Sequence, residues 1–280
     1  MVSRLFLVLG MHRSGTSVLT RALRIMGARL GDEHLHAHPC NPKGFFEDAD
    51  LNSFNEGLLK EINSVWRDPR PIDIVALKRL SAGVVGLQAL ALLKEKTGKN
   101  GALALKDPRM CRLLPFWRPV LAAAGLDVHC LVALRHPKSV AASLRQRDQL
   151  EEERSHALWI AHTLDALVHS EGLPRLCVDY DILMQTPKHQ ITRLGHFLNA
   201  RPDKAELDLF LADFLDNGLR HHTVTPHADN AGDDCAVFAG RLYENLRLAA
   251  IDKLDLESPR FQRSLRLRQQ EAIALCGNLP

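Results

Sequence analysis

The feature that most constrains this chain is a short apolar run that ends in a glycine-containing loop. Leu5–Leu9 is a run of five apolar residues, and Gly10 follows it directly. A run of this length bounded by glycine is typical of a strand buried on both faces of a sheet. Thr16–Met26 then carries apolar residues at helical spacing and is followed by Gly27, a common helix stop. The order strand, loop, helix favours an α/β fold with this strand at its centre.

Three further apolar runs are predicted strands: Ala102–Leu105, Val128–Leu134 and Arg175–Val178. Each follows a helical segment and precedes another one. Helices are also expected at Asp48–Ser64 and Ile72–Lys96. The second carries an apolar stripe that predicts a core-facing helix, formed by Ile74, Leu77, Leu80, Val84, Leu87, Leu90 and Leu93. This alternation of strands and helices is typical of a parallel sheet with helical crossovers.

The last part of the chain is expected to be mainly helical, from about Pro187 to Leu275, with a loop near His221–Asp234. At 280 residues the chain is long enough for one α/β domain with extra helices, and it shows no internal repeat or clear linker. We therefore expect a single domain over residues 1–280. It would consist of an α/β core over residues 1–200 and a helical extension over about residues 201–280.

Charge and cysteine content argue against several classes of protein. The chain has 36 basic and 33 acidic residues, a net charge of +3, which is too balanced for a dedicated nucleic-acid binder. Its six cysteines form no CxxC pair, so neither a disulfide framework nor a zinc ribbon is indicated. The apolar stretches are too short for a signal peptide or a membrane span. We expect a cytoplasmic protein with no nucleic-acid partner and no membrane span.

The segment Gly10–Ser17 has the GxxxxG spacing of a nucleotide phosphate loop, and it lies between a predicted strand and a predicted helix, as that function requires. Gly15 allows backbone amides to turn inward around an anion. The N–H groups and the dipole at the start of the helix complete the cradle. An ordinary glycine turn after a strand is the alternative interpretation.

This loop lacks the lysine of a Walker A motif. Thr16 stands where that lysine would serve the β- and γ-phosphates of ATP or GTP, which argues against nucleoside-triphosphate hydrolysis. The positive charge lies instead on Arg13. Together with the hydroxyls of Ser14, Thr16 and Ser17, it forms a donor set that suits a phosphosulfate and requires no magnesium.

His12–Ser17 resembles the 5′-phosphosulfate loop of sulfotransferases that use 3′-phosphoadenosine 5′-phosphosulfate (PAPS). The similarity is greatest to the Arg-Ser-Gly-Thr form of bacterial members and tyrosylprotein sulfotransferases. It implies a P-loop-like three-layer α/β fold with a central parallel sheet flanked by helices. It also implies PAPS as cofactor, 3′-phosphoadenosine 5′-phosphate (PAP) as its product, and no metal. The cofactor-binding residues implied in this loop are His12, Arg13, Ser14, Gly15, Thr16 and Ser17.

A second motif of this family follows the predicted strand Val128–Leu134. The family's 3′-phosphate site has an arginine at a strand end, a proline two residues later and a serine eight residues after the arginine. Arg135, Pro137 and Ser143 match this pattern, and guanidinium and hydroxyl groups are suited to a phosphate. Because the carboxyl ends of parallel strands meet at one edge, Arg135 should lie near the phosphate loop. The chain departs from the family at Lys138, where an acidic residue is common.

Lys106 is the predicted catalytic cation. It follows the predicted strand Ala102–Leu105 and begins a Lys-Asp-Pro element like that of tyrosylprotein and bacterial sulfotransferases. The resemblance implies that Lys106 and Arg13 contact the bridging oxygen or the 5′-phosphate. Such contacts stabilise the charge that develops on the leaving oxygen. The alternative is a solvated lysine at a strand end.

Glu47 is the predicted general base for the acceptor hydroxyl. It lies in the loop after the first predicted helix, where related enzymes place a catalytic glutamate. One alternative makes Glu47 or Asp48 a simple acidic residue at a helix N-terminus. In another branch of the superfamily histidine is the usual base, so His12 and His36 remain alternatives.

Two groups of histidines lie outside these motifs. His34, His36 and His38 alternate and precede Cys40, a pattern that on a strand would place possible zinc ligands on one face. The proline-containing loop composition argues against this, and we expect no metal site. His221–His222 lies in a late loop, where it would either line an acceptor pocket or be exposed to solvent.

We therefore predict a transferase that moves a sulfuryl group from PAPS to a hydroxyl, with Glu47, Lys106 and Arg13 as catalytic residues. The acceptor class stays open between a glycan, a lipid-linked sugar, a peptide tyrosine and a small metabolite. Val178–Leu183 resembles the family's strand-end segment before a short helix, and its expected role is architectural. The alternatives are a nucleotide kinase or NTPase, and a non-catalytic PAP- or nucleotide-binding module.

Overall fold

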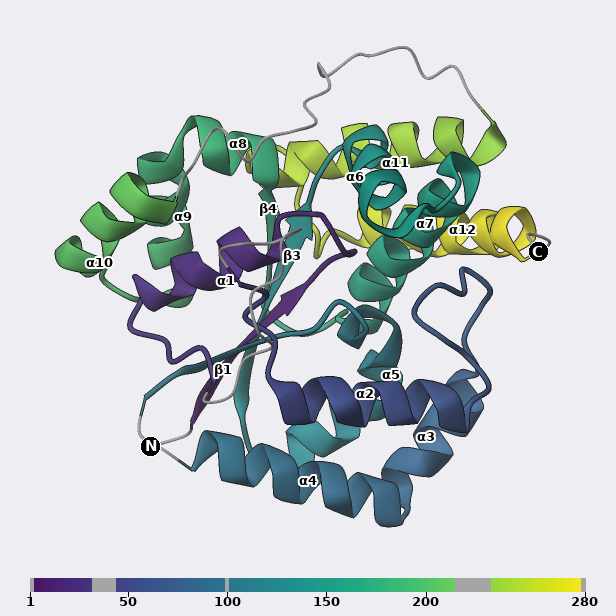
Figure 1. Ribbon diagram of the computed structural model, residues 1–280, viewed down its shortest axis with the longest axis horizontal. Helices are drawn as coiled ribbons and strands as arrows, with labels where there is room; N and C mark the ends of the chain where they lie inside the picture. Colours follow the sequence, from purple (N-terminus) through teal and green to yellow (C-terminus); the bar gives the residue numbers. More distant parts are fainter. Residues whose placement is uncertain (1–2, 32–43, 99–100, 215–232, 278–280) are drawn as a thin grey trace.

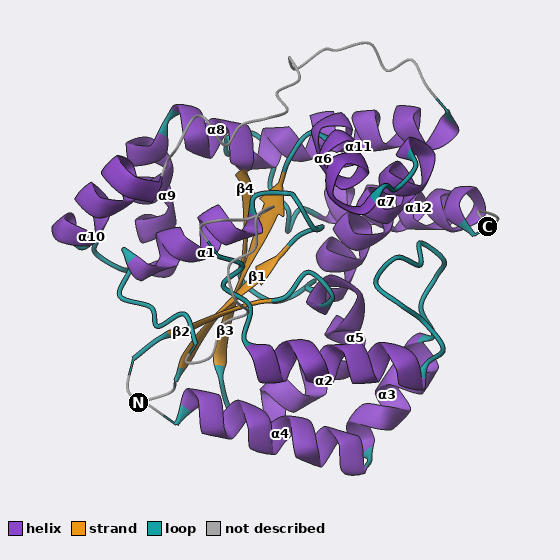
Figure 2. Cartoon of the chain, viewed as in Figure 1, coloured by secondary structure: helices purple, strands orange, loops and turns teal. Residues whose placement is uncertain are grey.

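The computed structural model describes residues 3–31, 44–98, 101–214 and 233–277 of the chain. Four parallel strands form one sheet in the order β2-β1-β3-β4, with helices on both faces (Figure 1, Figure 2). The predicted α/β fold with a central parallel sheet flanked by helices is confirmed. The strands are β1 Arg4–Leu9, β2 Leu103–Lys106, β3 Asp127–Leu134 and β4 Arg175–Asp179.

Alternate residues of β1 face two apolar layers, because successive side chains of a strand point to opposite faces of the sheet. Phe6 and Val8 pack into the layer that contains α1, α8 and α9. Leu5, Leu7 and Leu9 pack into the opposite layer. A strand that is buried on both faces is central, as its continuous apolar run predicts.

The helices of the first layer are α1 Thr16–Arg24, α8 Tyr180–Gln185, α9 Pro187–Leu198, α10 Lys204–Leu209 and a π-helical turn at Phe210–Phe214. The second layer holds the others. They are α2 Ala49–Glu61, α3 Ile74–Ala82, α4 Val84–Thr97, α5 Met110–Ala123, α6 Pro137–Asp148, α7 Glu152–His169, α11 Asp234–Ala250 and α12 Pro259–Cys276. The apolar faces of α11 and α12 pack with α7 and the sheet. The described residues of the C-terminal part are mainly helical, as predicted.

The strand order changes direction beside β1. The chain runs from β1 to β2 on one side and then crosses to β3 on the other side. In open α/β sheets, ligands bind at the carboxyl ends of the strands where this change occurs. Strand pairing aligns Val8 with Lys106, Leu9 with Val132, and Leu134 with Asp179, so the segments that follow all four strands share one edge.

The predicted single helix over Ile72–Lys96 is wrong, because α3 and α4 meet at a bend of 71°. Gly83 has extended backbone angles and separates the two helices. A Cβ on Gly86 would overlap the carbonyl group of Ser81, so the tight corner requires glycine there.

The bend also changes which side chains of this segment face the core. Val84 and Leu87 belong to the predicted core stripe, but their exposures are 70% and 67%. Leu77 and Leu93 of the same stripe are buried. Among the described helices, none is by itself long and apolar enough to cross a membrane, and α3 with α4 reaches that length and composition only as a bent pair.

Candidate active site

The loop after β1 turns away from the sheet through two glycines with positive φ. Gly10 has a φ of 144°, and a Cβ there would lie 2.7 Å from the carbonyl oxygen of Ala133 on β3. Only glycine lets the loop pass so close to the neighbouring strand. The Ser14 amide donates to the Met11 carbonyl oxygen at 3.1 Å, and Gly15, with a φ of 81°, leads into α1. The loop thus directs the start of α1 toward the carboxyl edge of the sheet.

Tyr180 and Arg135 pack beside this loop. A Cβ on Gly15 would overlap the ring of Tyr180, and the guanidinium of Arg135 lies 4.6 Å from the centroid of the same ring. That distance is within the range of a cation–π interaction. Arg135 Nη1 also donates to the Arg13 carbonyl oxygen at 3.1 Å, and Trp159 Nε1 donates to the Arg135 carbonyl oxygen at 3.1 Å. The two predicted phosphate motifs are therefore in direct contact.

Side chains of the two motifs also meet. Arg13 Nε donates to the hydroxyl of Ser143 on α6 at 2.8 Å. Ser17 Oγ donates to the Phe45 carbonyl oxygen at 3.2 Å, which joins the loop to the segment that carries Glu47. Hydrogen bonds thus connect the phosphate loop both to α6 and to the segment that precedes Glu47.

Two serine hydroxyls, one in the phosphate loop and one in the helix that carries Ser143, are buried without a hydrogen-bond partner among the described residues. Ser14 lies in the loop and Ser139 in the first turn of α6, and both are less than 2% exposed. Buried polar groups in folded proteins nearly always have a partner. The unsatisfied Ser14 hydroxyl, which follows Arg13 in the loop, is the arrangement expected where an anionic ligand supplies the missing acceptor.

Glu47 and Lys106 form a buried ion pair. Lys106 Nζ lies 2.7 Å from Glu47 Oε1, and the two residues are 2% and 5% exposed, respectively. Asn52 Nδ2 donates to Glu47 Oε2 at 2.9 Å, and Arg109 Nη1 lies 3.7 Å from the same oxygen. The predicted base and the predicted catalytic cation therefore stand together at the end of β2, beside the phosphate loop.

Asp48 has the capping role that the sequence left open between Glu47 and Asp48. Its Oδ1 accepts a hydrogen bond from the Leu51 amide at 3.1 Å and caps α2. Glu47 makes its described contacts with Lys106, Asn52 and Arg109 instead. The helix-capping interpretation therefore applies to Asp48.

Sequence reasoning missed the polar groups that surround this ion pair. Asp107 Oδ1 accepts from the amide and Nη1 of Arg109, each at 2.9 Å, and Oδ2 accepts from Asn55 Nδ2 at 2.9 Å. Burial raises the pKa of Asp107 above its ordinary value. Arg109 Nε also donates to Glu56 at 2.6 Å. Asp107 and Arg109 lie within three residues of Lys106, so the Lys-Asp-Pro element could have indicated them, whereas Asn55 and Glu56 lie mid-helix without any motif.

His12 is buried against an aromatic ring. Its ring centroid lies 4.4 Å from that of Trp66, and its Nε2 has no hydrogen-bond partner among the described residues. Burial first, and then the charges of Arg109 and Arg147, lower the pKa of His12 well below its ordinary value. His12 is therefore a neutral side chain at the edge of the loop.

Several predicted residues lie outside the described part of the chain. These are the three alternating histidines with Cys40, and the pair in the late loop: His34, His36, His38, Cys40, His221 and His222. In the ranges that the structure does describe, the one close group of three possible metal ligands is Glu153, Asp233 and Cys235. These residues lie at the starts of α7 and α11, not in the loop or strand-end motifs.

No protein-family model and no curated protein matches this chain. Among solved structures, it is similar to the sulfotransferase domain of the Synechococcus PCC 7002 olefin synthase, with 15% identity, coverage of 87% of this chain and 96% of that chain, and a TM-score of 0.45. It is similar to the sulfotransferase domain of the curacin biosynthetic pathway, with 18% identity, coverage of 100% and 99%, and a TM-score of 0.44. It is also similar to a sulfotransferase from Mycobacterium avium, with 16% identity, coverage of 91% and 78%, and a TM-score of 0.45. Similarities this distant do not themselves assign a function.

Proposed function

We propose that this protein is a PAPS-dependent sulfotransferase that transfers a sulfuryl group to a hydroxyl by in-line displacement. The observation that carries the proposal is the contact between two anion-binding motifs. Arg13 donates to Ser143, and Arg135 donates to the Arg13 carbonyl oxygen. A phosphate loop alone suits many nucleotides, but a second arginine–serine set beside it supports a ligand with two separate anionic groups. PAPS carries such groups on its 5′ and 3′ sides.

The residues present fit this cofactor. The positive-φ turn at Gly15 and the start of α1 offer backbone N–H groups, and the buried Ser14 hydroxyl lacks a partner among the described residues. Arg135 and Ser143 offer a guanidinium and a hydroxyl for the 3′-phosphate. When bound, PAPS would supply the activated sulfuryl group. The proposed cofactor-binding residues are His12, Arg13, Ser14, Gly15, Thr16, Ser17, Arg135 and Ser143.

Glu47, Lys106 and Arg13 are the proposed catalytic residues. Glu47 would accept the proton of the acceptor hydroxyl, and Lys106 Nζ, 2.7 Å away, would balance charge on the leaving phosphate oxygen. Both groups are buried and hydrogen-bonded, so they are held in place before substrates bind. His12 remains the alternative base; its ring is buried against Trp66, and burial lowers its pKa well below its ordinary value.

We extend the proposal to the setting of the reaction. The acceptor would be a glycan, another carbohydrate or another small molecule that carries a hydroxyl. No metal or nucleic acid would take part. The protein would act in the cytoplasm as a single domain, with its α/β core over residues 1–200 and its helical extension over about residues 201–280. The balanced charge of +3 and the cationic loop support a small anionic cofactor rather than a polyanion.

Calorimetry with PAP and ADP, each with and without magnesium, tests the proposal. PAP should bind in the presence of EDTA, and ADP, which lacks the 3′-phosphate, should bind at least about tenfold more weakly, since one charged contact contributes about 1.5 kcal/mol or more. Tighter binding of ADP than PAP, or magnesium-dependent ATP turnover, would favour the kinase or NTPase alternative. PAP binding without any sulfated product would favour the non-catalytic module.

A further inference from the structure

The chain contains two tyrosines, and both lie at the carboxyl end of β4. Tyr180 is the first residue of α8, and its ring contacts the phosphate motifs as described above. Tyr243 belongs to α11, in the helical C-terminal part, and is 2% exposed. One buried carboxylate, that of Asp179, connects the two.

Asp179 is the last residue of β4 and is fully buried. Its Oδ2 accepts a hydrogen bond from the Tyr243 hydroxyl at 2.8 Å, and its Oδ1 accepts from the Ile182 amide at 2.9 Å, which caps α8. Burial raises the pKa of Asp179 above its ordinary value. A buried carboxylate is costly unless it is hydrogen-bonded, so these two donors fix its orientation.

The cap at Asp179 determines where α8 begins, and therefore where the Tyr180 ring lies. That ring packs against Gly15 of the phosphate loop and against the guanidinium of Arg135. A continuous series of contacts thus runs from Tyr243 on α11, through Asp179 and Tyr180, to both phosphate motifs.

A second contact joins Tyr243 to the same site. The ring of His136 lies edge-on to the ring of Tyr243, with centroids 4.9 Å apart. His136 Nδ1 accepts a hydrogen bond from the Lys138 amide at 3.3 Å and caps α6, the helix that carries Ser143. Tyr243 therefore contacts the residue next to Arg135 through its ring and supports Tyr180 through its hydroxyl.

We propose that Tyr243 is a positioning residue for the cofactor site. Its hydroxyl holds Asp179, and through Asp179 and Tyr180 it holds Arg135 in the orientation that a 3′-phosphate requires. This inference rests on the proposed function, and it gives α11 a part in cofactor binding that the strand-end motifs do not reveal.

The substitution Tyr243→Phe tests this role, because it removes the hydroxyl and keeps the ring that packs against His136. We expect the Kd for PAP and the KM for PAPS to rise about fivefold to tenfold, the size of the loss of one typical intramolecular hydrogen bond, while kcat stays within about twofold. The matched control is Ser170→Ala. It removes a buried hydroxyl that donates to the Ala166 carbonyl oxygen at 2.6 Å at the end of α7, away from both motifs. The control should leave PAP affinity unchanged.

Hydrogen exchange of the ligand-free protein provides a second readout. Amides of residues 10–17 and of Ile182 should exchange faster in Tyr243→Phe than in wild type, and not in Ser170→Ala. If wild-type protein does not bind PAP, the proposed function fails, and exchange alone decides whether Tyr243 holds the loop. If wild type binds PAP and Tyr243→Phe binds it equally well, the positioning role is overturned. Unchanged exchange at these amides also overturns it.

Discussion

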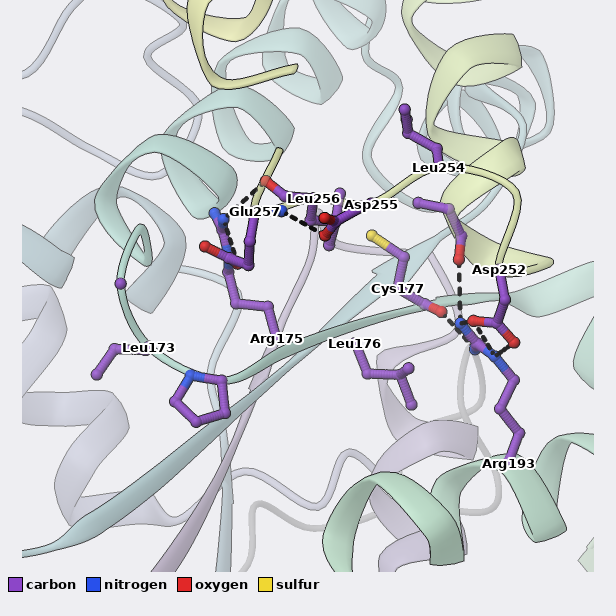
Figure 3. Close-up of a pocket in the computed structure, with 13 residues that line it drawn as sticks. Leu173, Arg175, Leu176, Cys177, Arg193, Asp252, Leu254, Asp255, Leu256 and Glu257 are labelled. Carbon is purple, nitrogen blue, oxygen red and sulfur yellow. Dashed lines mark hydrogen bonds and ion pairs between the residues drawn. The ribbon is translucent and has the colours of Figure 1, made fainter. Parts of the chain in front are cut away.

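Two regions of this protein each contain two arginines beside the sheet, one region at the carboxyl ends of the strands and the other near the amino end of β4, and they use them differently. At the carboxyl end, Arg13 and Arg135 contact a serine hydroxyl, a backbone carbonyl oxygen and the ring of Tyr180. Near the amino end, Arg175 and Arg193 line a cavity of about 520 Å³ between β4 and the connection from α11 to α12 (Figure 3). Both regions therefore place guanidinium groups beside the ends of strands.

The arginines beside the cavity are neutralised by carboxylates of the same chain. Arg175 Nη2 lies 2.6 Å from Glu257 Oε1, and Arg193 Nη2 lies 2.6 Å from Asp252 Oδ1 (Figure 3). Both also donate to backbone carbonyl oxygens, Arg193 to that of Cys177 at 2.7 Å. These contacts fasten the connection between α11 and α12 to β4, so the cavity is a poor site for an anion.

Arginines beside a cavity thus do not by themselves make an anion site. At the carboxyl end of the sheet, by contrast, the buried hydroxyl of Ser14 in the phosphate loop has no acceptor among the described residues. Substitutions matched between the two regions separate the effects of these two arrangements.

The largest effect is expected for Glu47→Gln compared with Glu257→Gln. Glu47→Gln should lower kcat by about 100-fold or more, because a general base contributes about that much, and should leave PAP affinity within about twofold. Glu257→Gln weakens the ion pair with Arg175 and should leave kcat unchanged. Steady-state kinetics and calorimetry measure both. Wild-type turnover by Glu47→Gln would exclude it as the base.

The second-largest effect is expected for the pair Gly15→Ala and Gly172→Ala, which should differ in PAP affinity. Both glycines have positive φ, 81° and 79°, so both substitutions cost about 1–2 kcal/mol of folding free energy through backbone strain. At Gly15 the new Cβ also overlaps the Tyr180 ring, and PAP affinity should fall about 50-fold or more, a loss of over 2 kcal/mol. At Gly172 a Cβ meets nothing within 4 Å, and PAP affinity should be unchanged. Equal PAP affinities in the two variants would contradict the loop geometry.

The third pair of substitutions is Arg135→Ala and Arg193→Ala, for which we expect a smaller difference in PAP affinity than for the glycine pair. Arg135→Ala should weaken PAP binding by about tenfold to 30-fold, as expected for a charged phosphate contact. Arg193→Ala leaves the Cys177 carbonyl oxygen without its donor, so it should lower the free energy of unfolding by about 1–3 kcal/mol with PAP affinity unchanged. Calorimetry and urea denaturation separate the two outcomes. If Arg193→Ala were the variant that weakened PAP binding, the roles of the two regions would be reversed.

The smallest effect concerns pH. Burial lowers the pKa of His162, near the phosphate loop, to about 3, whereas its unfolded value is about 6.5. As the pH falls through 6.5, His162 therefore takes up a proton in the unfolded chain but not in the folded protein. The contribution of His162 to the free energy of unfolding is fully present above about pH 6.5 and declines as the pH falls below that value. From pH 7 to pH 6, His162 should account for a loss of about 0.7 kcal/mol.

His162→Gln should remove this part of the pH dependence in urea denaturation. In the cavity region, the hydrogen bond from Arg193 lowers the pKa of Asp252, which is ionised at both pH values and contributes no change. An identical pH dependence in His162→Gln and wild type would show that the histidine is not buried as described.

Much of the fold could be predicted because its strands are short apolar runs whose side chains are buried on both faces. The contact between the two phosphate motifs also followed from the sequence, since the ends of parallel strands meet at one edge. The break at Gly83 did not, because it depends on the close approach of Gly86 to Ser81 in the folded chain. The Tyr243–Asp179 hydrogen bond joins residues 64 positions apart, and α11 carries no motif that indicates it.

Sulfuryl transfer itself can be measured by single turnover with radiolabelled PAPS and pooled hydroxylated acceptors in the presence of EDTA. The proposal predicts that label moves from PAPS to an acceptor, with PAP formed in equal amount, and that Glu47→Gln slows this transfer by about 100-fold. Retention of all label on PAPS, together with magnesium-dependent hydrolysis of ATP by the same protein, would contradict it.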